Sequence, residues 1–230
     1  MESAVDEEGF AVLPEFLSKK EIEIPIEAIE LATPRRSRAG MRHALTLEPV
    51  ASIAHHSRVT QLAQSVLGPA AFPFHATLFD KSAKSNWLVV WHQDRALPLR
   101  ERRDLAGWGP WSIKEGVVYA HAPASSLSQV LALRIHLDDS TSSNGPLRVL
   151  PGTHALGVLD DSRIQELSAK INAVECLTSA GGIVAMRPLL VHASSKSQAD
   201  AKRRVLHIEY AASPEIAAPL GLFVTASSSI

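Results

Sequence analysis

The chain has 230 residues, of which 46% are hydrophobic and 20% are charged. Its 23 basic and 24 acidic residues nearly balance, so electrostatics implies neither a nucleic acid nor an anionic membrane as a partner. The single cysteine, Cys176, excludes an internal disulfide and a cysteine-rich zinc site, and it is typical of a reducing compartment. We expect one domain over residues 1–230, with a substantial core.

The amino terminus and the hydropathy bear on where the protein resides. The first eight residues are acidic where a secretory signal would be basic. No apolar run approaches the ~20 residues that a membrane-spanning helix needs. These features predict a cytoplasmic protein with no membrane partner, and they predict no particular oligomeric state.

The first third of the chain predicts one strand and then helices. Gly9–Pro14 is typical of a short strand that a proline ends. Ser18 is a plausible N-cap for a helical pattern over residues 19–32. Pro25 interrupts that pattern, so we expect it to break or kink any single helix there.

The next segment combines a basic loop with a long helical pattern. Arg35 to Arg42 contains four arginines and a glycine, which is typical of a solvated surface loop. Leu47 to Leu67 carries a regular apolar stripe that Gly68 ends, and it predicts a single helix. His55 and His56 would lie on that helix as surface or packing residues.

From residue 72 the hydrophobic period changes from 3.6 to 2, which indicates strands. Six strands are expected, over residues 74–79, 87–94, 130–137, 147–150, 183–191 and 205–210. A polar helix is expected over residues 160–173. Helices followed by many short strands with turn residues predict a mainly β sandwich or barrel with helical cover.

One long segment, residues 95–128, shows little regular pattern and contains several glycines and prolines. A loop of this length inside a compact domain is usually functional or mobile. Its aromatic residues favour a lid over a pocket, although such residues also serve simply to pack a loop against the protein.

The expected strand over residues 87–94 ends in His92-Gln93-Asp94. Because side chains alternate along a strand, His92 and Asp94 share one face. An imidazole and a carboxylate from one rigid strand supply two of the three ligands of a facial iron(II) site. A hydrogen-bonded pair at a strand end is the alternative, since so short a motif also occurs by chance.

A third ligand and a carboxylate anchor are available near the carboxyl terminus. His192 ends the strand that begins near Ile183, and distant strands are neighbours in a jelly roll. Arg203 and Arg204 follow at the start of the last strand, and a guanidinium binds a carboxylate bidentately. Arg204 shares the apolar face that would pack against helices. The alternation therefore favours Arg203, with Arg134 of an earlier strand, as pointing into the barrel.

Several short motifs together resemble the phytanoyl-CoA dioxygenase family of iron(II)/2-oxoglutarate-dependent oxygenases, over roughly residues 9–210. The motifs are Gly9-Phe10, Leu13-Pro14, Leu78-Phe79-Asp80-Lys81, Trp91-His92-Gln93-Asp94, Leu137-Asp138-Asp139, Asn144-Gly145-Pro146-Leu147, Leu150-Pro151-Gly152-Thr153-His154, His192-Ala193-Ser194 and Arg203. Each is weak alone, but their order and spacing are specific.

The resemblance implies a double-stranded β-helix, that is, a cupin-like jelly roll, with amino-terminal helices packed on one sheet. It implies that His92, Asp94 and His192 bind iron(II). It further implies that Arg203, helped by Ser194, holds the distal carboxylate of 2-oxoglutarate, and that the residues at two further positions contact this co-substrate, namely Thr77 and Arg134. His154 would be a hydrogen-bonded turn residue, and His75 and His136 are either pocket walls or interior polar groups.

The reaction implied is oxidative, with O2 and 2-oxoglutarate consumed, succinate and CO2 released, and a small organic molecule hydroxylated at an unactivated C–H bond. Two other functions use the same ligands. One is a metal-dependent hydrolase with a metal-bound water. The other is a non-catalytic cupin-like binding protein. Neither needs an arginine inside the barrel.

The substrate is not specified by these motifs. Four arginines just after the predicted triad would suit an anionic substrate or would form a solvated face; they are Arg95, Arg100, Arg102 and Arg103. Five aromatic residues would line a pocket for a hydrophobic molecule; they are Trp87, Trp91, Trp108, Trp111 and Tyr119.

Overall fold

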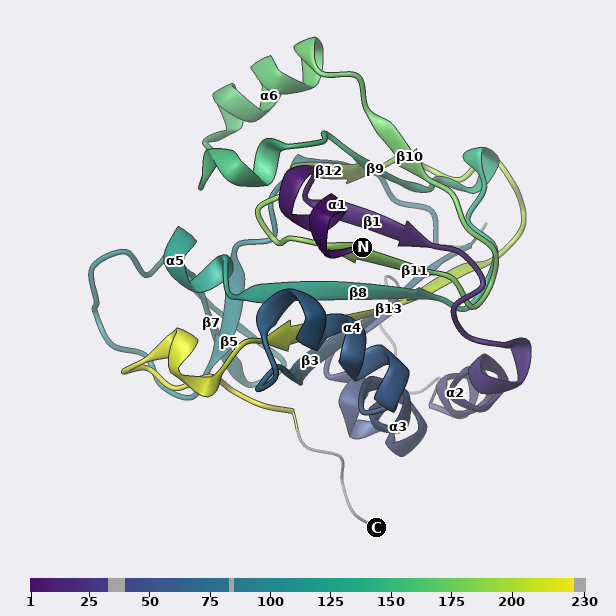
Figure 1. Ribbon diagram of the computed structural model, residues 1–230, viewed down its shortest axis with the longest axis horizontal. Helices are drawn as coiled ribbons and strands as arrows, with labels where there is room; N and C mark the ends of the chain where they lie inside the picture. Colours follow the sequence, from purple (N-terminus) through teal and green to yellow (C-terminus); the bar gives the residue numbers. More distant parts are fainter. Residues whose placement is uncertain (33–39, 83–84, 226–230) are drawn as a thin grey trace.

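The computed structural model describes residues 1–32, 40–82 and 85–225. Two antiparallel sheets lie one above the other, and helices cover the outer face of the larger one (Figure 1). The predicted basic loop from Arg35 to Arg42 lies largely outside the described residues. Among those residues, no helix combines the length and apolar character needed to cross a bilayer.

The larger sheet has six strands. Their spatial order is β1 (Phe10–Leu13), β11 (Ile183–Met186), β8 (Val130–His136), β13 (Arg203–Ala211), β3 (Phe72–Lys81) and β2 (Gly40–Met41). Strand β13 lies at the centre, where His207 pairs with Thr77 of β3 on one side and with Arg134 of β8 on the other. These three side chains therefore lie side by side on the inner face of the sheet.

Helices cover the outer face of the larger sheet, as the sequence predicts. They are α1 (Glu2–Glu7), α2 (Lys19–Leu31), α3 (Glu48–Ala54) and α4 (Ser57–Leu67). Leu131, Leu133 and Ile135 alternate along β8 and pack into one buried cluster with apolar residues of α2, α3 and α4. The alternation thus buries one face of β8 under helices and leaves Arg134 and His136 facing the interior of the barrel.

The smaller sheet has four strands, in the order β10 (Val174–Cys176), β9 (Leu147–Val149), β12 (His192–Ser194) and β4 (Val89–His92). Helix α6 (Asp161–Lys170) packs against it through Ile164 and Leu167. Between the two sheets lies an apolar cluster that combines Ala132 and Val184 of the larger sheet with Val149 of the smaller one. The interior of the sandwich is therefore apolar at this end.

The segment over residues 95–128 was expected to be irregular, and this expectation is wrong. It forms a third sheet, β5 (Ala96–Leu99), β7 (Val117–His121) and β6 (Trp111–Lys114), and the short helix α5 (Ala124–Leu127). The β6–β7 hairpin turns at Glu115 and Gly116, which both have positive φ, at 51° and 82°. A two-residue turn of this kind matches the twist of the strands that it joins.

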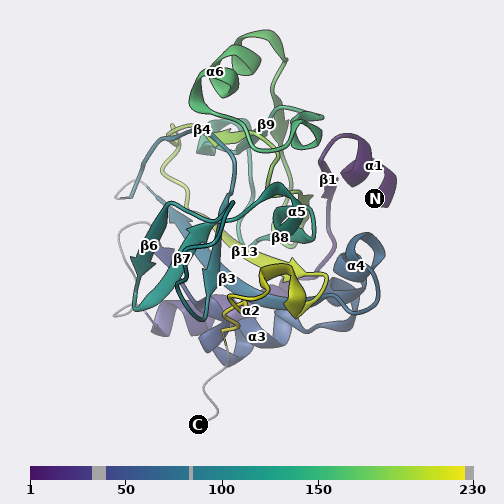
Figure 2. The ribbon, with the colours of Figure 1, turned by 90° about the vertical axis from the view of Figure 1, so that its left-hand side faces the viewer.

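Figure 2 shows this third sheet beside β3 and β13, below β4. Trp108 and Trp111 pack against its apolar cluster, which includes Leu97 and Leu99. These two tryptophans thus help to hold the small sheet on the sandwich. The described residues also form short 3-10 turns over Ala44–Thr46, Ser142–Asn144, Thr153–Leu156 and Pro214–Ala217.

Two helix predictions differ from the structure. The pattern over residues 47–67 forms two helices, because the hydroxyl of Tyr210 in β13 donates to the carbonyl of Ala54 and so supports the end of α3 there. His55 and His56 form the junction instead of lying on one helix. Conversely, α2 runs continuously through Pro25; its start is stabilised by a capping box that Ser18 forms with Glu21.

Two strand predictions also differ. Residues 183–191 are not one strand: Pro188 has no N–H, and the chain turns where the amide of Leu190 donates to the carbonyl of Arg187. As a result β11 and β12 belong to different sheets. Strand β4 is shorter than expected and lies at a sheet edge, where Val90 is 67% exposed, so it is not a buried strand.

Candidate metal centre

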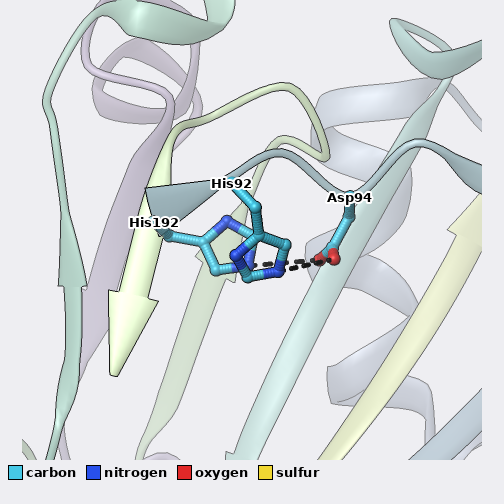
Figure 3. A group of neighbouring side chains, drawn as sticks. All are labelled: His92, Asp94 and His192. Carbon is cyan, nitrogen blue, oxygen red and sulfur yellow. Dashed lines mark ion pairs between the residues drawn. The ribbon is translucent and has the colours of Figure 1, made fainter. Parts of the chain in front are cut away.

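Three side chains from two strands of the smaller sheet converge at one point (Figure 3). His92 ends β4, Asp94 follows two residues later, and His192 begins β12 directly opposite His92 in the antiparallel pair. Nε2 of His92 lies 3.6 Å from Oδ1 of Asp94, and Nε2 of His192 lies 3.5 Å from Oδ2. One nitrogen or oxygen atom of each residue lies within 4.8 Å of the others. The spacing suits one metal ion.

Backbone carbonyls orient both imidazoles. Nδ1 of His92 lies 2.9 Å from the carbonyl oxygen of Val90, and Nδ1 of His192 lies 2.9 Å from that of Leu190. A carbonyl oxygen only accepts, so each Nδ1 carries the proton and donates. In the neutral form of each ring the lone pair is then on Nε2, the atom that faces Asp94. This is the arrangement in which a histidine is ready to bind a metal.

Gln93, between two of these residues, holds the end of β4 in place. It is 5% exposed, and its amide group donates to the carbonyls of Gly157 and Leu189 at 2.8 and 2.7 Å. Its carbonyl oxygen accepts from the amide of Leu159 at 2.9 Å. All the hydrogen-bonding directions of the side chain except one are therefore used, and His92 and Asp94 emerge from an anchored backbone.

The charges of the three residues favour a cation between them. Burial opposes ionisation of Asp94, but the surrounding histidines, His192 first, hold the pKa of this carboxyl well below its usual range. Burial lowers the pKa of His192 to about 4, so the ring is neutral at pH 7. For His92, burial acts in the same direction and is the largest single effect, but the hydrogen bond and the charge of Asp94, together with backbone hydrogen bonds, outweigh it and raise the pKa.

A small cavity of about 100 Å³ opens on one side of the triad. Among the described residues that line it, Asp94 is the only acid, and the bases besides His92 and His192 are Lys81, Arg134 and Arg203. Arg203 is 4% exposed; its Nη2 donates to the hydroxyl of Ser194 at 3.2 Å, and its Nη1 is buried without a partner. Burial, and then Arg134, lower the pKa of Arg203 to about 10. The cavity therefore suits a small anion.

Arg204 is occupied elsewhere. Its Nε and Nη2 donate to the two carboxylate oxygens of Asp138 at 2.8 and 2.7 Å, and its Nη1 donates to Glu30 at 2.9 Å. This bidentate pair lies on the helix-covered side of the larger sheet, away from the triad. Of the two neighbouring arginines, only Arg203 has a free N–H directed into the cavity.

Lys81 is a member of this cavity that the sequence did not single out. It is 1% exposed, and its Nζ donates to the hydroxyl of Ser194 at 2.8 Å and to the carbonyl of Ser195 at 2.6 Å. Burial, together with Arg203 and Arg134, lowers its pKa to about 8. The motif Leu78-Phe79-Asp80-Lys81 was the available signal, since alternation from Leu78 places Lys81 on the inner face.

Ser194 links these bases to a tight turn. Its hydroxyl accepts from Lys81 and Arg203 and donates to the carbonyl of Gly145 at 2.8 Å. Gly145 has a φ of 67°, and a Cβ atom there would lie 2.3 Å from the carbonyl oxygen of Ser195. Only glycine allows the turn to approach the strand so closely.

A larger cavity of about 320 Å³ lies on the other side of the triad. Asp94 and Phe79 line both cavities, so the triad lies where the two meet. Thr77 and His207 line the larger cavity, and Arg134 lines the smaller one. The structure thus places Thr77 apart from Arg203, on the opposite side of the triad.

The sequence did not single out His207, which lies on the same face of β13 as Arg203. Nη1 of Arg134 lies 2.9 Å from its Nδ1, and its Nε2 lies 4.0 Å from Oδ2 of Asp94. Other histidines have separate environments. Nδ1 of His75 contacts Glu209 at 2.9 Å and its Nε2 contacts the hydroxyl of Tyr119 at 3.1 Å, in the wall of the larger cavity.

His136 is an interior residue, whose ring nitrogens have no partner among the described residues. His154 contacts the carbonyl of Asp6, as expected of a turn residue. Of the predicted pocket aromatics, Trp87 lines the smaller cavity and Tyr119 the larger one. Trp91 instead packs against the cluster under α6.

Comparison with known proteins identifies the family. The sequence profile of the phytanoyl-CoA dioxygenase family matches residues 5–205. The chain belongs to this family of dioxygenases. It is also 27% identical over 175 residues to L-proline trans-4-hydroxylase from Streptomyces griseoviridis, a match that covers 65% of this chain and 58% of that protein. The chain therefore spans less than two thirds of this curated relative.

Several solved structures share the fold of this chain. EctD from S. alaskensis with bound iron superposes with a TM-score of 0.68 at 19% identity, over 91% of this chain and 74% of that one. The α-ketoglutarate-dependent carbocyclase SnoK from nogalamycin biosynthesis gives a TM-score of 0.70 at 18% identity, over 91% and 81%. The predicted cupin-like jelly roll, with helices on one sheet, is confirmed.

Proposed function

We propose that this family member is an iron(II)- and 2-oxoglutarate-dependent dioxygenase that hydroxylates an unactivated C–H bond of a small organic molecule. The observation that carries the proposal is the unpartnered, buried Nη1 of Arg203, a residue that lines the same small cavity as the triad. A metal triad alone suits several functions, whereas a buried guanidinium next to it suits a co-substrate that carries a carboxylate.

The residues fit iron(II). His92, Asp94 and His192 supply two neutral imidazole nitrogens and one carboxylate oxygen, which is the donor set of non-heme iron oxygenases. When bound, iron(II) would let O2 serve as the oxidant: one oxygen atom would replace C–H by C–OH, and the other would enter succinate as 2-oxoglutarate is oxidised with loss of CO2. The related EctD structure contains iron, which supports this choice of metal.

The protein's own contribution is orientation and the exclusion of water. Arg203 and Lys81 would hold the distal carboxylate of 2-oxoglutarate, because both are buried cations that line the small cavity. Ser194 would help by orienting them, since its hydroxyl accepts from both. Arg134 would add a further positive charge beside the carboxylate. The larger cavity would hold the substrate, with the reacting carbon on the side where Asp94 and His207 lie. Binding on opposite sides of the triad keeps the two molecules apart and their reacting atoms close.

Two other functions remain as alternatives. A metal-dependent hydrolase needs one metal-bound water and has no use for three bases in a second cavity. A non-catalytic binding protein needs no orientation of both imidazole lone pairs toward one carboxylate. The donor set and the cationic cavity together favour the oxygenase. Residues 1–230 would form one catalytic domain, located in the cytoplasm.

The test is succinate formation. The protein is reconstituted anaerobically with iron(II) and 2-oxoglutarate, air is admitted, and succinate is measured with and without candidate substrates, L-proline included because a relative hydroxylates it. We expect slow succinate formation even without substrate, and none for His92→Ala or His192→Ala. Absence of iron-dependent succinate with every candidate would contradict the proposal and favour a binding protein.

A further inference from the structure

The third sheet, which the sequence did not predict, lines the larger cavity with basic residues. Arg95 precedes β5, Lys114 ends β6 and His121 ends β7, and all three line this cavity. Arg95 and Lys114 both lower the pKa of His121, after burial, so the three bases are close enough to interact. They form one basic cluster, Arg95–Lys114–His121, on the wall that faces the triad.

In the part of the chain that the structure describes, Arg95 and Lys114 form no ion pair with an acidic side chain. Arg95 has a buried Nε without a hydrogen-bond partner, and within residues 1–32, 40–82 and 85–225 no carboxylate lies within ion-pair distance of Arg95 or Lys114. The remaining residues, 33–39, 83–84 and 226–230, contain no aspartate or glutamate in the sequence. Every acidic side chain is therefore accounted for.

The acids near the cavity have other partners. Glu209 contacts His75 at 2.9 Å, and Glu115 pairs with Arg42 at 3.2 Å. Asp94 faces His92 and His192. Asp94 and Glu209 do raise the pKa of Lys114, but burial and Arg42 outweigh them and lower it. Lys114 lies over the ring of Tyr119, with 4.9 Å from Nζ to the ring centroid, rather than at a carboxylate.

Uncompensated positive charge in a partly buried cavity is unfavourable unless a ligand supplies the opposite charge. The charged exterior of the same segment does not share this property: Arg103 is exposed and pairs with Glu101 at 2.7 Å. The arginines after the triad thus divide into a solvated group and a single one, Arg95, that faces the cavity.

Building on the proposed function, we propose that the substrate is a small molecule with an anionic group, a carboxylate or a phosphate, that binds Arg95 and Lys114. His121 completes the binding site as a hydrogen-bond partner through its buried Nδ1. The cavity of about 320 Å³ lies at the lower end of the range for ligand sites, so it suits a compact acid. The anionic group, held on the β5–β7 side, directs the rest of the molecule toward Asp94.

The test compares matched compounds on the iron-loaded protein at saturating 2-oxoglutarate. Short carboxylates, amino acids among them, are each paired with the primary amide, and phosphate monoesters are each paired with the parent alcohol. Stimulation of succinate formation is measured in air, and binding is measured anaerobically by calorimetry. We expect binding of one kind of acid at least about tenfold tighter than of its neutral partner, because a charge-assisted bond is lost. The carboxylate and phosphate series show which anion is bound.

Variants locate the binding site. Arg95→Gln and Lys114→Gln each keep a polar side chain and remove a charge, and Arg103→Gln removes an exposed charge as the matched control. We expect the first two to bind the acid about tenfold more weakly and to lose its advantage over the amide, and the control to bind it as wild type does. Equal binding of acid and amide by wild-type protein, or an unchanged preference in both cavity variants, would overturn the inference. These outcomes leave iron-dependent succinate formation intact, whereas its absence contradicts the proposed function itself.

Discussion

Nη1 of Arg134 donates to Nδ1 of His207 at 2.9 Å, and this bond joins the walls of the two cavities across the larger sheet. An arginine only donates, so Nδ1 of His207 must accept and the neutral ring carries its proton on Nε2. This Nε2 lies 4.0 Å from Oδ2 of Asp94. Arg134, a base of the smaller cavity, therefore determines that the nitrogen of His207 nearest the triad carries the proton.

From this follows a prediction for His207→Leu, which fills similar space and removes both nitrogens. Asp94 would lose a neighbour that orients it, and Arg134 would lose its hydrogen bond, so we expect about tenfold weaker iron binding. Competition titration with a metal-sensitive dye measures it. His55→Leu, at an exposed histidine, is the control. Unchanged affinity in His207→Leu would show that the ring does not position Asp94.

A second prediction separates the two neighbouring arginines. Arg203→Met removes the free donor of the smaller cavity, so we expect the KM for 2-oxoglutarate to rise by at least about tenfold. Arg204→Met instead breaks the bidentate pair with Asp138, so we expect a loss of about 2 kcal/mol of unfolding free energy and an unchanged KM. Steady-state kinetics and urea unfolding of both variants measure these effects. If Arg204 held 2-oxoglutarate instead, Arg204→Met would raise the KM and Arg203→Met would leave it unchanged.

Residue alternation explains why this distinction could be predicted from sequence. Leu131, Leu133 and Ile135 identify the face of β8 under the helices, and Arg203 and Arg204 necessarily lie on opposite faces of β13. The triad could be predicted in a similar way. Side-chain alternation places His92 and Asp94 on one face, and the family motifs add His192.

Other features depend on contacts between distant residues, so local pattern could not reveal them. The burial of Lys81 depends on Ser194, 113 positions later, and the break before α4 depends on Tyr210 in β13. The third sheet was missed because its strands are only four or five residues long and glycines and prolines separate them. Its hairpin turn has glycine at one position only, with Glu115 at the other.

A third prediction concerns Lys81 and pH. Its pKa of about 8 means that the free protein loses this positive charge as the pH rises through that value. A bound dianion raises the pKa, so affinity for 2-oxoglutarate is constant below pH 8 and falls by up to about tenfold per pH unit above it. Lys81→Met should bind more weakly and with little pH dependence over this range. Anaerobic calorimetry between pH 6.5 and about 9 tests this; Lys170→Met, at an exposed lysine, should keep the wild-type profile.

A fourth prediction concerns Gln93. Gln93→Leu keeps the volume but leaves the carbonyls of Gly157 and Leu189 and the amide of Leu159 without their partner. Unpaired buried polar groups cost about 1–3 kcal/mol each, so we expect a loss of at least about 3 kcal/mol of unfolding free energy. Because the backbone between His92 and Asp94 loses its anchor, iron affinity should fall as well. Gln165→Leu, on the exposed face of α6, is the matched control for stability. Wild-type stability in Gln93→Leu would mean that the loop around residue 157 is held by other contacts.

The last prediction concerns acid stability and His136. Burial, then Arg134 and Arg203, lower the pKa of this histidine from 6.5 to about 3. Below pH 6.5 the unfolded chain takes up a proton that the folded chain does not, so this residue favours unfolding increasingly as the pH falls toward 3. At pH 5 the contribution is at most about 2 kcal/mol relative to pH 8. His136→Leu removes the titrating group, so the difference in unfolding free energy between pH 8 and pH 5 should shrink by up to that amount. Urea unfolding at both pH values measures it in wild type, His136→Leu and the exposed-site control His55→Leu. An equal pH dependence in wild type and His136→Leu would show that the pKa of His136 is not lowered in the folded protein.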